Sequence, residues 1–590
     1  MKLFTTFGLV QRGHCVGITR RFALLCLSIL LIFSGITMKG CLQPTEDIEG
    51  ISEEEEQSTS AIAEPSPVLF FDDGSAALWG NASVIDLYDW SFSQRDLDPS
   101  YDRATATKVL LSGETITVDG PGVVAEGTSL TITSEGSYIV SGMLTNGSIA
   151  VELPGDTDKV QVVLDGATIH CEDGAAFIVE SADKVFITLA EGSENKLSDG
   201  ATHAAVEDDD LHDGVIFSHD DLTLNGTGAL IIEGAHANGI VSKDDVRITG
   251  GTYEIRANGH GIQGKDCVKI LDGSFAITSA QGKDGIHASN DEDETLGYLG
   301  IGGGKFVIDS DDDGLHAESA LLITGGTIDI TQSYEGIEGK TVSLAGGKIK
   351  IVAEDDGVNA AQGSNLQDDQ SLRGLGEFTG ELPGEARERQ TPDQPPRDEP
   401  GWVRSGEANQ ESNRSRGDFP QGNNNPAMAA NEECFIEISD GKLSVMSGAD
   451  GLDSNGSIII SGGNTIIDSA ASNDNSALDA DLGASISAGT FVAIGSAGMA
   501  QGFGADSAQA QIMVNSSTKT TVGQEITVND VKGNAVFAVT PQVSQTNIVI
   551  SLPQLREGET YTLNSGETIL GSVEATFQTG SGLGVPREGW

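Results

Sequence analysis

The sequence is poor in basic residues, proline and aromatic side chains. Its 33 lysines and arginines stand against 89 aspartates and glutamates, which gives a formal charge of −56. This charge would repel a polyanion, so nucleic acid is excluded as a partner, and cations or neutral polymers are the expected partners. Only 16 prolines accompany 76 glycines, and aromatic residues make up 5% of the chain. This composition favours an all-β fold with a narrow, aliphatic core.

Cysteine is also scarce, and its spacing excludes two kinds of site. Cys171, Cys267 and Cys434 are the cysteines that follow the N-terminal region. Three widely spaced cysteines form neither a disulfide framework nor a thiolate site for zinc or iron–sulfur clusters, so we expect buried apolar residues. The sequence also lacks the motifs of EF-hands, P-loops, zincins and nucleophile elbows.

The apolar run near the N-terminus is short for a membrane-spanning helix. Residues 22–36 form a run of 15 residues that follows three arginines, as in a signal peptide. Cys41 comes directly after a small residue, which predicts a bacterial lipoprotein anchored through this cysteine. An uncleaved N-terminal anchor is the alternative. Both interpretations predict an extracellular, cell-surface protein attached to the membrane by its N-terminus.

One short phrase returns along the chain: a polar residue, glycine, an aliphatic residue, a variable position and a small residue. It occurs at 238–240, 260–264, 284–288, 313–317, 335–339, 356–360 and 450–454. Successive glycines from Gly239 to Gly357 are 22, 24, 29, 22 and 21 residues apart, a period typical of one solenoid coil. Between the phrases, period-2 alternation and glycine corners indicate three short strands per coil. The pattern predicts a right-handed parallel β-helix, a three-sided solenoid of about 22 residues per coil with a C-terminal β cap.

The interruptions of this array define the predicted domains. They are a signal peptide at 1–41, a disordered acidic tether at 42–66, an N-terminal strand-rich region and cap at 67–135, the β-helix at 136–361, a disordered insertion at 362–433, the continued β-helix at 434–500 and a C-terminal β-strand cap at 501–590. Solenoids grow in one direction, so one long domain accommodates this length, and we expect a monomer.

Acidic and amide residues flank the repeated glycines, one position before and two positions after. Since the aliphatic residue between them points inward, both sets should line one outer edge. Carboxylates one coil apart repel by about 3.5 kcal/mol at an effective dielectric of 20, so a ladder of them requires bridging cations. Such oxygen-rich clusters favour Ca²⁺. The predicted metal ligands are Asp284, Asn290, Asp291, Asp293, Asp311, Asp312, Asp313, Glu335 and Asp356, with a second cluster at Asp209 and Asp210. The alternative is that Asp-Gly pairs make turns and acidic loops remain solvated.

Two histidines occupy equivalent positions of successive coils. His287 and His316 each lie two residues after a repeated glycine. We interpret them as a stacked polar ladder, because no third nitrogen or sulfur ligand joins them to complete a metal site.

Several longer phrases resemble those of a known family. They are found at 147–149, 158–166, 182–192, 216–223 and 242–251. They resemble the carbohydrate-binding domain family of exported bacterial and archaeal β-helix proteins, and the resemblance extends over about residues 136–570. It implies a fold similar to that of calcium-dependent pectate lyases, bound Ca²⁺, and binding of a plant-type polysaccharide such as cellulose or polygalacturonate.

We therefore expect a calcium-stabilised surface protein that binds polysaccharide. The alternatives are a calcium-dependent polysaccharide (pectate) lyase and a structural or adhesion solenoid. In such lyases a lysine or arginine beside Ca²⁺ takes the proton next to a uronate carboxylate. Lys243, Lys265 and Lys340, each four residues after a repeated glycine, are the candidate bases, and solvated corner charges are the alternative interpretation.

Overall fold

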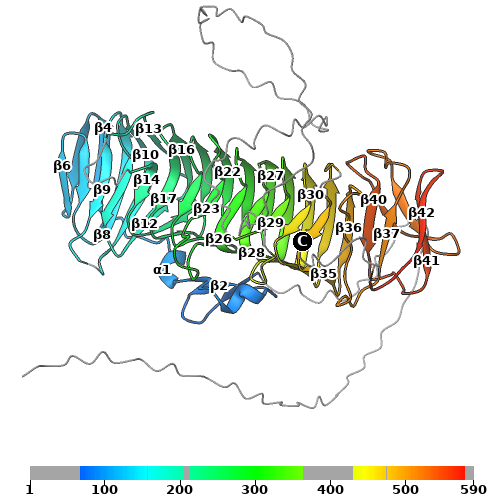
Figure 1. The fold of residues 1–590 in the computed structure, drawn as a ribbon. Coiled ribbons are helices and arrows are strands. Elements are labelled where there is room, and N and C mark those ends of the chain that lie inside the picture. The colour runs from blue at the N-terminus through cyan, green and yellow to red at the C-terminus, as the bar shows by residue number, and fades with distance from the viewer. Residues whose placement is uncertain (1–66, 156, 205–211, 363–429, 473–474, 579–590) are drawn as a thin grey trace, which may run out of the picture. The chain divides into compact units, whose positions relative to one another are not determined.

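The computed structural model describes residues 67–155, 157–204, 212–362, 430–472 and 475–578. Its regular structure is almost entirely β-strand, in sheets of 3, 35 and 4 strands (Figure 1). The predicted signal peptide, Cys41, the tether, Asp209, Asp210 and nearly all of the predicted insertion lie outside the described residues. Within the described part of the chain, no helix has the length and apolarity needed to span a bilayer.

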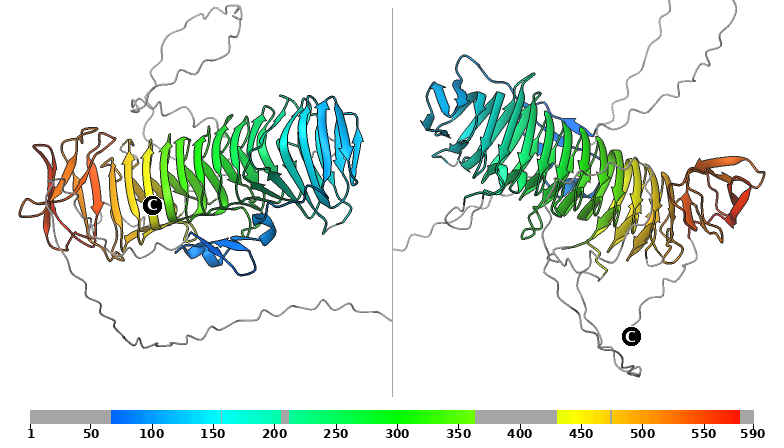
Figure 2. Two further views of the ribbon diagram at one scale, coloured as in Figure 1. Left: turned by 180° about the vertical axis from the view of Figure 1, so that it is seen from behind. Right: turned by 90° about the horizontal axis from the view of Figure 1, so that it is seen from above.

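In the large sheet, most strands pair in parallel with the third strand that follows. For example, β12 (Lys184–Leu189) pairs with β15 (Asp221–Gly226), which pairs with β18 (Asp245–Ile248). The chain therefore winds around a common core, with each winding stacked on the one before. Figures 1 and 2 show these windings side by side, from the cyan strands to the yellow ones.

The stacked windings form a continuous wall around the core, and three rows of strands run along this wall. The first row contains β7 (Ser129–Ile132), β9 (Ser148–Glu152), β11 (Phe177–Ser181), β14 (Gly214–Ser218), β17 (Asn238–Ser242), β20 (Ile262–Gly264), β23 (Ile286–Ala288), β26 (Leu315–Ile323), β28 (Ile337–Ala353), β29 (Val358–Ala360), β31 (Leu452–Ser454) and β34 (Leu478–Ala480). The second row contains β4 (Thr107–Gly113), β8 (Gly136–Leu144), β10 (Lys159–Cys171), β12, β15, β18, β21 (Cys267–Ile270), β24 (Tyr298–Ile301), β26, β28, β30 (Phe435–Ser447), β32 (Ser457–Ile460) and β35 (Gly483–Ile486). The third row contains β10, β13 (Glu194–Asp199), β16 (Ala229–Gly234), β19 (Thr252–Ala257), β22 (Ser274–Ser279), β25 (Lys305–Asp309), β27 (Thr327–Gln332), β28, β30, β33 (Asn464–Ser469) and β36 (Thr490–Gly495).

The predicted fold class requires correction. The prediction of a uniform three-sided, right-handed solenoid is wrong, because the rows are not separate faces. Strands β10, β26 and β30 run across corners and belong to two rows each, and β28 belongs to all three rows, which joins 35 strands into a single sheet. Strand β28 illustrates how rows become joined at a corner. Its 17 residues form one strand, because its glycines continue the strand through the corner instead of ending it. The observed architecture is an all-β, closed, barrel-like wall of mainly parallel strands, with further strands outside it.

Antiparallel strands occur at both ends of the wall. At one end, β5 (Thr115–Asp119) pairs with β4, and β6 (Val123–Glu126) pairs with β7. At the other end, β40 (Asn547–Ser551) lies between β36 and β37 (Gln511–Asn515). A separate four-stranded sheet follows, composed of β39 (Ala535–Val539), β38 (Ile526–Asn529), β41 (Thr560–Ser565) and β42 (Thr568–Glu574). The regular parallel stacking of the wall therefore gives way to antiparallel pairs at its two ends.

The core explains the repeated glycines. The aliphatic residues of the phrase, such as Ile262, Ile286 and Leu315, are fully buried and stacked in register. A Cβ atom on Gly239 would lie 2.6 Å from the carbonyl oxygen of Gly261 and 2.7 Å from a methyl group of Ile255. Glycine is needed here for close approach of the next winding. At the corner between the second and third strand rows, glycine is needed because the backbone has a positive φ, for example at Gly326 (φ +92°). The three later cysteines are free and buried, which confirms that prediction.

An N-terminal segment packs against the outside of the wall. It contains β1 (Val68–Phe70), β2 (Ala76–Leu78), η1 (Ser83–Asp86), β3 (Ser91–Phe92) and α1 (Gln94–Leu97). Trp90 and Phe92 are buried in one cluster with Tyr298 and Leu322 of the wall. The ammonium group of Lys269 is fully buried and donates a hydrogen bond to the carbonyl of Asp89 at 2.9 Å. Apolar burial and a satisfied buried charge together fix the segment to the wall.

Candidate functional site: an acidic ridge along the wall

Two lines of polar residues run along the outside of the first strand row, and we call them together the acidic ridge. The residues directly before the repeated glycine position form its first line: Asn238, His260, Asp284, Asp313, Glu335, Asp356, Asp450 and Ser476. The residues at the middle of each short strand form its second line: Gln263, His287, His316, Glu338, Asn359, Asp453 and Asp479. Strand pairing brings members of the second line directly opposite one another on successive windings.

The first line has a structural role that uses half of each carboxylate. The backbone N–H of Asp313 donates to Oδ1 of Asp284 at 3.1 Å, and the N–H of Glu335 donates to Oδ1 of Asp313 at 3.2 Å. The N–H of Asp450 donates to Oδ1 of Asp356 at 2.7 Å. One oxygen of each of these aspartates therefore ties two windings together, and the second oxygen of Asp284 and of Asp313 faces a histidine ring.

Burial and mutual repulsion act on the carboxylates of the ridge. Burial, together with the neighbouring carboxylates, raises the pKa of Asp313, Glu335 and Asp356 well above the usual range. The same causes raise the pKa of Asp450 to about 8 and that of Asp453 to about 7. Without a cation, several of these groups would hold a proton at neutral pH.

Histidines change the electrostatics at one end of the ridge. Burial alone would raise the pKa of Asp284, but the adjacent ring of His260 and the nearby His287 and His316 hold it below its usual range. Burial lowers the pKa of His287. Burial would also lower the pKa of His316, but the carboxylates around it, first among them Glu338, raise it. The ridge therefore has a mixed nitrogen and oxygen end and an oxygen-rich end.

Several predicted ligands do not join the ridge. The amide of Asn290 donates to Asp266 at 2.8 Å and its oxygen accepts from the N–H groups of Glu292 and Asp293. Asp293 accepts from Thr295, and this hydrogen bonding lowers its pKa. Both residues therefore stabilise their own loop.

The other aspartates of these two runs are placed differently. Asp291 is exposed. Asp311 is also exposed and accepts from the N–H of Gln281 at 2.9 Å. Asp312 precedes the ridge residue Asp313 and is half-buried. The structure thus brings Asp284, Asp313, Glu335 and Asp356 together and leaves these neighbours at the margin.

The three lysines considered as bases each lie close to an acidic side chain. The ammonium group of Lys340 lies 2.6 Å from Glu433, and although burial alone would lower its pKa, this pairing raises it. Lys265 lies 3.8 Å from Glu292, and Lys243 lies 3.5 Å from Asp213. A catalytic base of this type requires a lowered lysine pKa, so the environment of Lys340 opposes that role.

Comparison with known proteins identifies the family. The profile of the carbohydrate-binding domain-containing protein family matches residues 126–371. A carbohydrate-binding domain-containing protein of Acetivibrio thermocellus (strain ATCC 27405) is 33% identical over 242 residues, which are 40% of this chain and 82% of the relative. The chain belongs to this family. The structure of the polysaccharide lyase-like protein from C. thermocellum, a gadolinium derivative, is 30% identical and covers 41% of this chain and 93% of its own, with a TM-score of 0.35.

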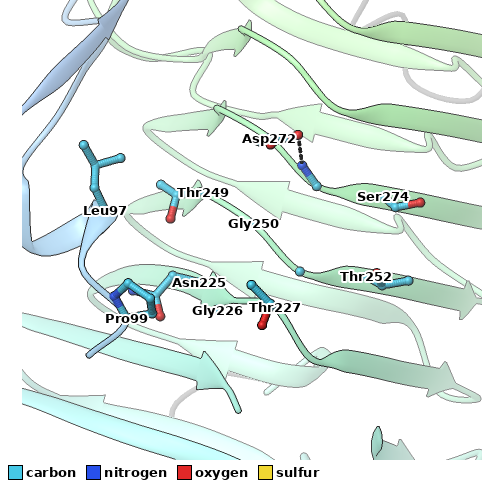
Figure 3. A pocket seen from close by; sticks show the side chains of 12 residues that line it. Leu97, Pro99, Asn225, Gly226, Thr227, Thr249, Gly250, Thr252, Asp272 and Ser274 are labelled. Atoms are coloured by element: carbon cyan, nitrogen blue, oxygen red, sulfur yellow. Dashed lines mark hydrogen bonds between the residues drawn. The ribbon is translucent and has the colours of Figure 1, made fainter. Parts of the chain in front are cut away.

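This carbohydrate-binding domain-containing protein also has a pocket away from the ridge. A pocket of about 410 Å³ lies between the N-terminal segment and the wall (Figure 3). Its lining includes Leu97 and Pro99 on one side and Thr227, Thr252 and Ser274 on the other. None of its twelve lining residues is aromatic, so it offers hydroxyl groups but no ring on which a sugar could stack.

Several residues in the ridge or beside it are absent from the predicted ligands, and for three of them, His260, Asp479 and Glu318, the sequence contains a signal. His260 stands in the repeated phrase, where only the acidic members were selected. Asp479 follows Ala477 and Leu478, a variant of the phrase in which alanine replaces glycine. Glu318 lies two residues after His316 in β26, and strand alternation puts both side chains on the same side.

Proposed function

We propose that this protein binds polysaccharide in a calcium-dependent manner along the acidic ridge. The observation that carries the proposal is the line of buried, stacked carboxylates, in which burial and neighbouring carboxylates raise the pKa of Glu335, Asp356 and Asp453. Membership of the carbohydrate-binding domain-containing family supports a carbohydrate as the ligand.

The oxygen-rich end of the ridge suits a hard cation. Glu335 accepts a hydrogen bond from the amide of Asn359 at 3.0 Å, and Glu338 and Asn359 lie opposite each other on adjacent strands. Carboxylate and amide oxygens at varied distances match the six to eight oxygen ligands of Ca²⁺. A calcium ion held here by a few protein oxygens has further positions for oxygens of a polymer. The ion thereby offsets the repulsion that the acidic surface exerts on an acidic polysaccharide.

Binding assays with and without Ca²⁺ test this function. After chelator treatment, calcium affinity is measured by calorimetry and retention is measured on polygalacturonate and on cellulose. We expect Ca²⁺ to be required for retention, and the double variant Glu335→Gln/Glu338→Gln to lose about 100-fold or more in calcium affinity, because two charged ligands are removed. Glu114→Gln/Glu126→Gln is the matched control, since both residues are exposed and the charge change is equal. Equal retention in calcium and in chelator would contradict the proposal.

A polysaccharide lyase is the second candidate function. If Lys340 were the base, Lys340→Ala would abolish the unsaturated uronate product while polymer binding persisted. We expect no calcium-dependent product from the parent protein, and Lys340→Ala to bind polymer as the parent does. Absorbance of the unsaturated product from polygalacturonate decides between a binding protein and an enzyme.

We also propose that the protein is exported and attached to the membrane by lipid on Cys41. The anchor would hold the ridge outside the cell, where polysaccharide is met. Labelling of the protein with a fatty acid should be lost in Cys41→Ser, and labelling that persists in this variant would contradict the anchor.

A further inference from the structure

The histidine end of the ridge has an arrangement that calcium binding does not explain. The rings of His287 and His316 lie on successive windings, with centroids 4.6 Å apart. Nδ1 of His287 lies 3.2 Å from Oδ2 of Asp284, and Nδ1 of His316 lies 3.0 Å from Oδ2 of Asp313. Because an ionised carboxylate only accepts, the proton of each neutral ring belongs on Nδ1. The lone pair of each ring is then on Nε2.

Both Nε2 atoms approach one carboxylate. Nε2 of His287 lies 3.5 Å from Oε1 of Glu318, and Nε2 of His316 lies 3.9 Å from the same oxygen. The three residues can each offer one ligand atom within 4.8 Å of the other two. The three side chains are only 10–13% exposed. Three lone pairs that converge in a largely buried position repel one another, so a proton or a cation between them is needed to make the arrangement favourable.

His287 provides a second, independent observation. Within the described residues, both of its ring nitrogens are buried and make no hydrogen bond, although they lie near Asp284 and Glu318. A buried polar group left without a partner destabilises a protein, and such groups are rare in native structures. An ion at Nε2 would satisfy one of these atoms and would align the ring with Asp284 behind it.

We propose that Nε2 of His287, Nε2 of His316 and the carboxylate of Glu318 bind a divalent transition-metal ion of the zinc class. Two imidazoles and one carboxylate are a ligand set of zinc and non-haem iron sites, whereas Ca²⁺ takes oxygen ligands. Bonds of about 2.0–2.2 Å put tetrahedral ligands roughly 3.3–3.6 Å apart, and the two distances from Nε2 to Glu318, 3.5 and 3.9 Å, are close to this range. With three protein ligands, the ion retains an open position for an oxygen of water or of a sugar.

The groups around the trio fit supporting roles. Asp284 and Asp313 lie at the Nδ1 side of the two rings. In metal sites of other proteins, carboxylates in this position orient the histidines that bind the ion. His260 is also close to Asp284, at 3.3 Å, but its Nδ1 accepts the backbone N–H of Asp284 at 3.2 Å. Its lone pair at that nitrogen is therefore engaged, which assigns His260 to the backbone ladder. The site goes beyond the calcium-dependent function proposed above and does not depend on it.

Calorimetry with ZnCl₂ tests the site in chelator-treated full-length protein that has no polyhistidine tag. We expect one zinc ion per chain to bind in the presence of excess CaCl₂, and Co²⁺ to give the visible absorption of a four- or five-coordinate site. His287→Gln, His316→Gln and Glu318→Gln should each weaken zinc binding by about 100-fold or more. Asp284→Asn should weaken it by about 10- to 100-fold through loss of ring orientation.

The residue at the equivalent position of the preceding winding indicates which substitution should leave the variant folded. Gln263 occupies the position equivalent to His287 on the preceding winding, so glutamine fits this line of the ridge. His260→Gln is the matched control, and its zinc affinity should stay within about 3-fold of the parent. Melting curves in chelator verify that each variant is folded, and Glu318→Gln serves if a histidine variant is not.

Three results would overturn the proposal. They are the absence of zinc binding to the folded parent, undiminished zinc binding in His287→Gln/His316→Gln, and a loss in His260→Gln as large as that in His287→Gln. Asp450→Asn/Asp453→Asn separates this proposal from the calcium function, because it should lose calcium affinity at the oxygen-rich end of the ridge and keep zinc affinity.

Discussion

In chelator, the protein should become less stable as the pH rises from about 5 to about 8, and Ca²⁺ should remove most of this loss. Asp450 and Asp453 have pKa values of about 8 and about 7 in the folded state, against ordinary values in the unfolded chain. Between the two sets of values the folded state holds more protons, so the free energy of unfolding falls as pH rises. Calcium bound at the proposed site would replace these protons and, by binding only the folded chain, would stabilise it by mass action.

Melting temperatures at pH 5.5 and pH 8, each in chelator and in CaCl₂, measure this effect. We expect the metal-free protein to melt at least about 5 °C lower at pH 8 than at pH 5.5, and the calcium-loaded protein to show a much smaller difference. Asp453→Asn should raise the melting temperature of the metal-free protein at pH 8, because one repelling charge is removed. A metal-free protein that is more stable at pH 8 than at pH 5.5 would contradict the prediction.

Gly239→Ala should destabilise the wall by about 3 kcal/mol or more, an effect of the kind seen when a packed interior is overfilled. The added Cβ would meet the backbone carbonyl of Gly261 and the Ile255 side chain at 2.6 and 2.7 Å, and the carbonyl belongs to the next winding. The backbone of one winding cannot move away without breaking the hydrogen bonds that join it to its neighbours. Chemical denaturation followed by circular dichroism measures the change.

Gly174→Ala is the matched control for this substitution. The nearest atom to an added Cβ at Gly174 is the sulfur of Cys171 at 3.6 Å, an ordinary contact. We expect a change within about 1 kcal/mol, of either sign. Similar losses in both variants would show that close approach between windings is not the reason for glycine at position 239.

The repeated phrase was sufficient to predict which residues stack. Ile262, Ile286 and Leu315 are in register in the core, and Asp284 and Asp313 are in register at the ridge, because strand alternation and a fixed repeat determine both. The metal roles of these residues stay predictions. The family was also recognisable from the longer phrases of the sequence.

The features that the sequence did not reveal depend on contacts outside the repeat. The continuity of β28 through its corner was missed because Gly346 and Gly347 read as a break between strands. The zinc-class trio was missed because Glu318 lies outside the repeated phrase and was not paired with the histidines. The docking of the N-terminal segment was missed because it depends on contacts between residues far apart in the sequence. For example, the hydroxyl of Ser83 donates to the carboxylate of Glu437 at 2.8 Å, and these two residues are 354 positions apart.

The docking of this segment has a consequence for the order of folding. Residues 67–97 leave the ribosome early, yet the surface that they cover includes Lys269, Tyr298 and Glu437. The first part of the described chain to be synthesised must therefore wait, with Trp90 and Phe92 uncovered, until the middle windings exist. The segment is synthesised before the windings that it covers, so it packs against the wall as a late step in folding.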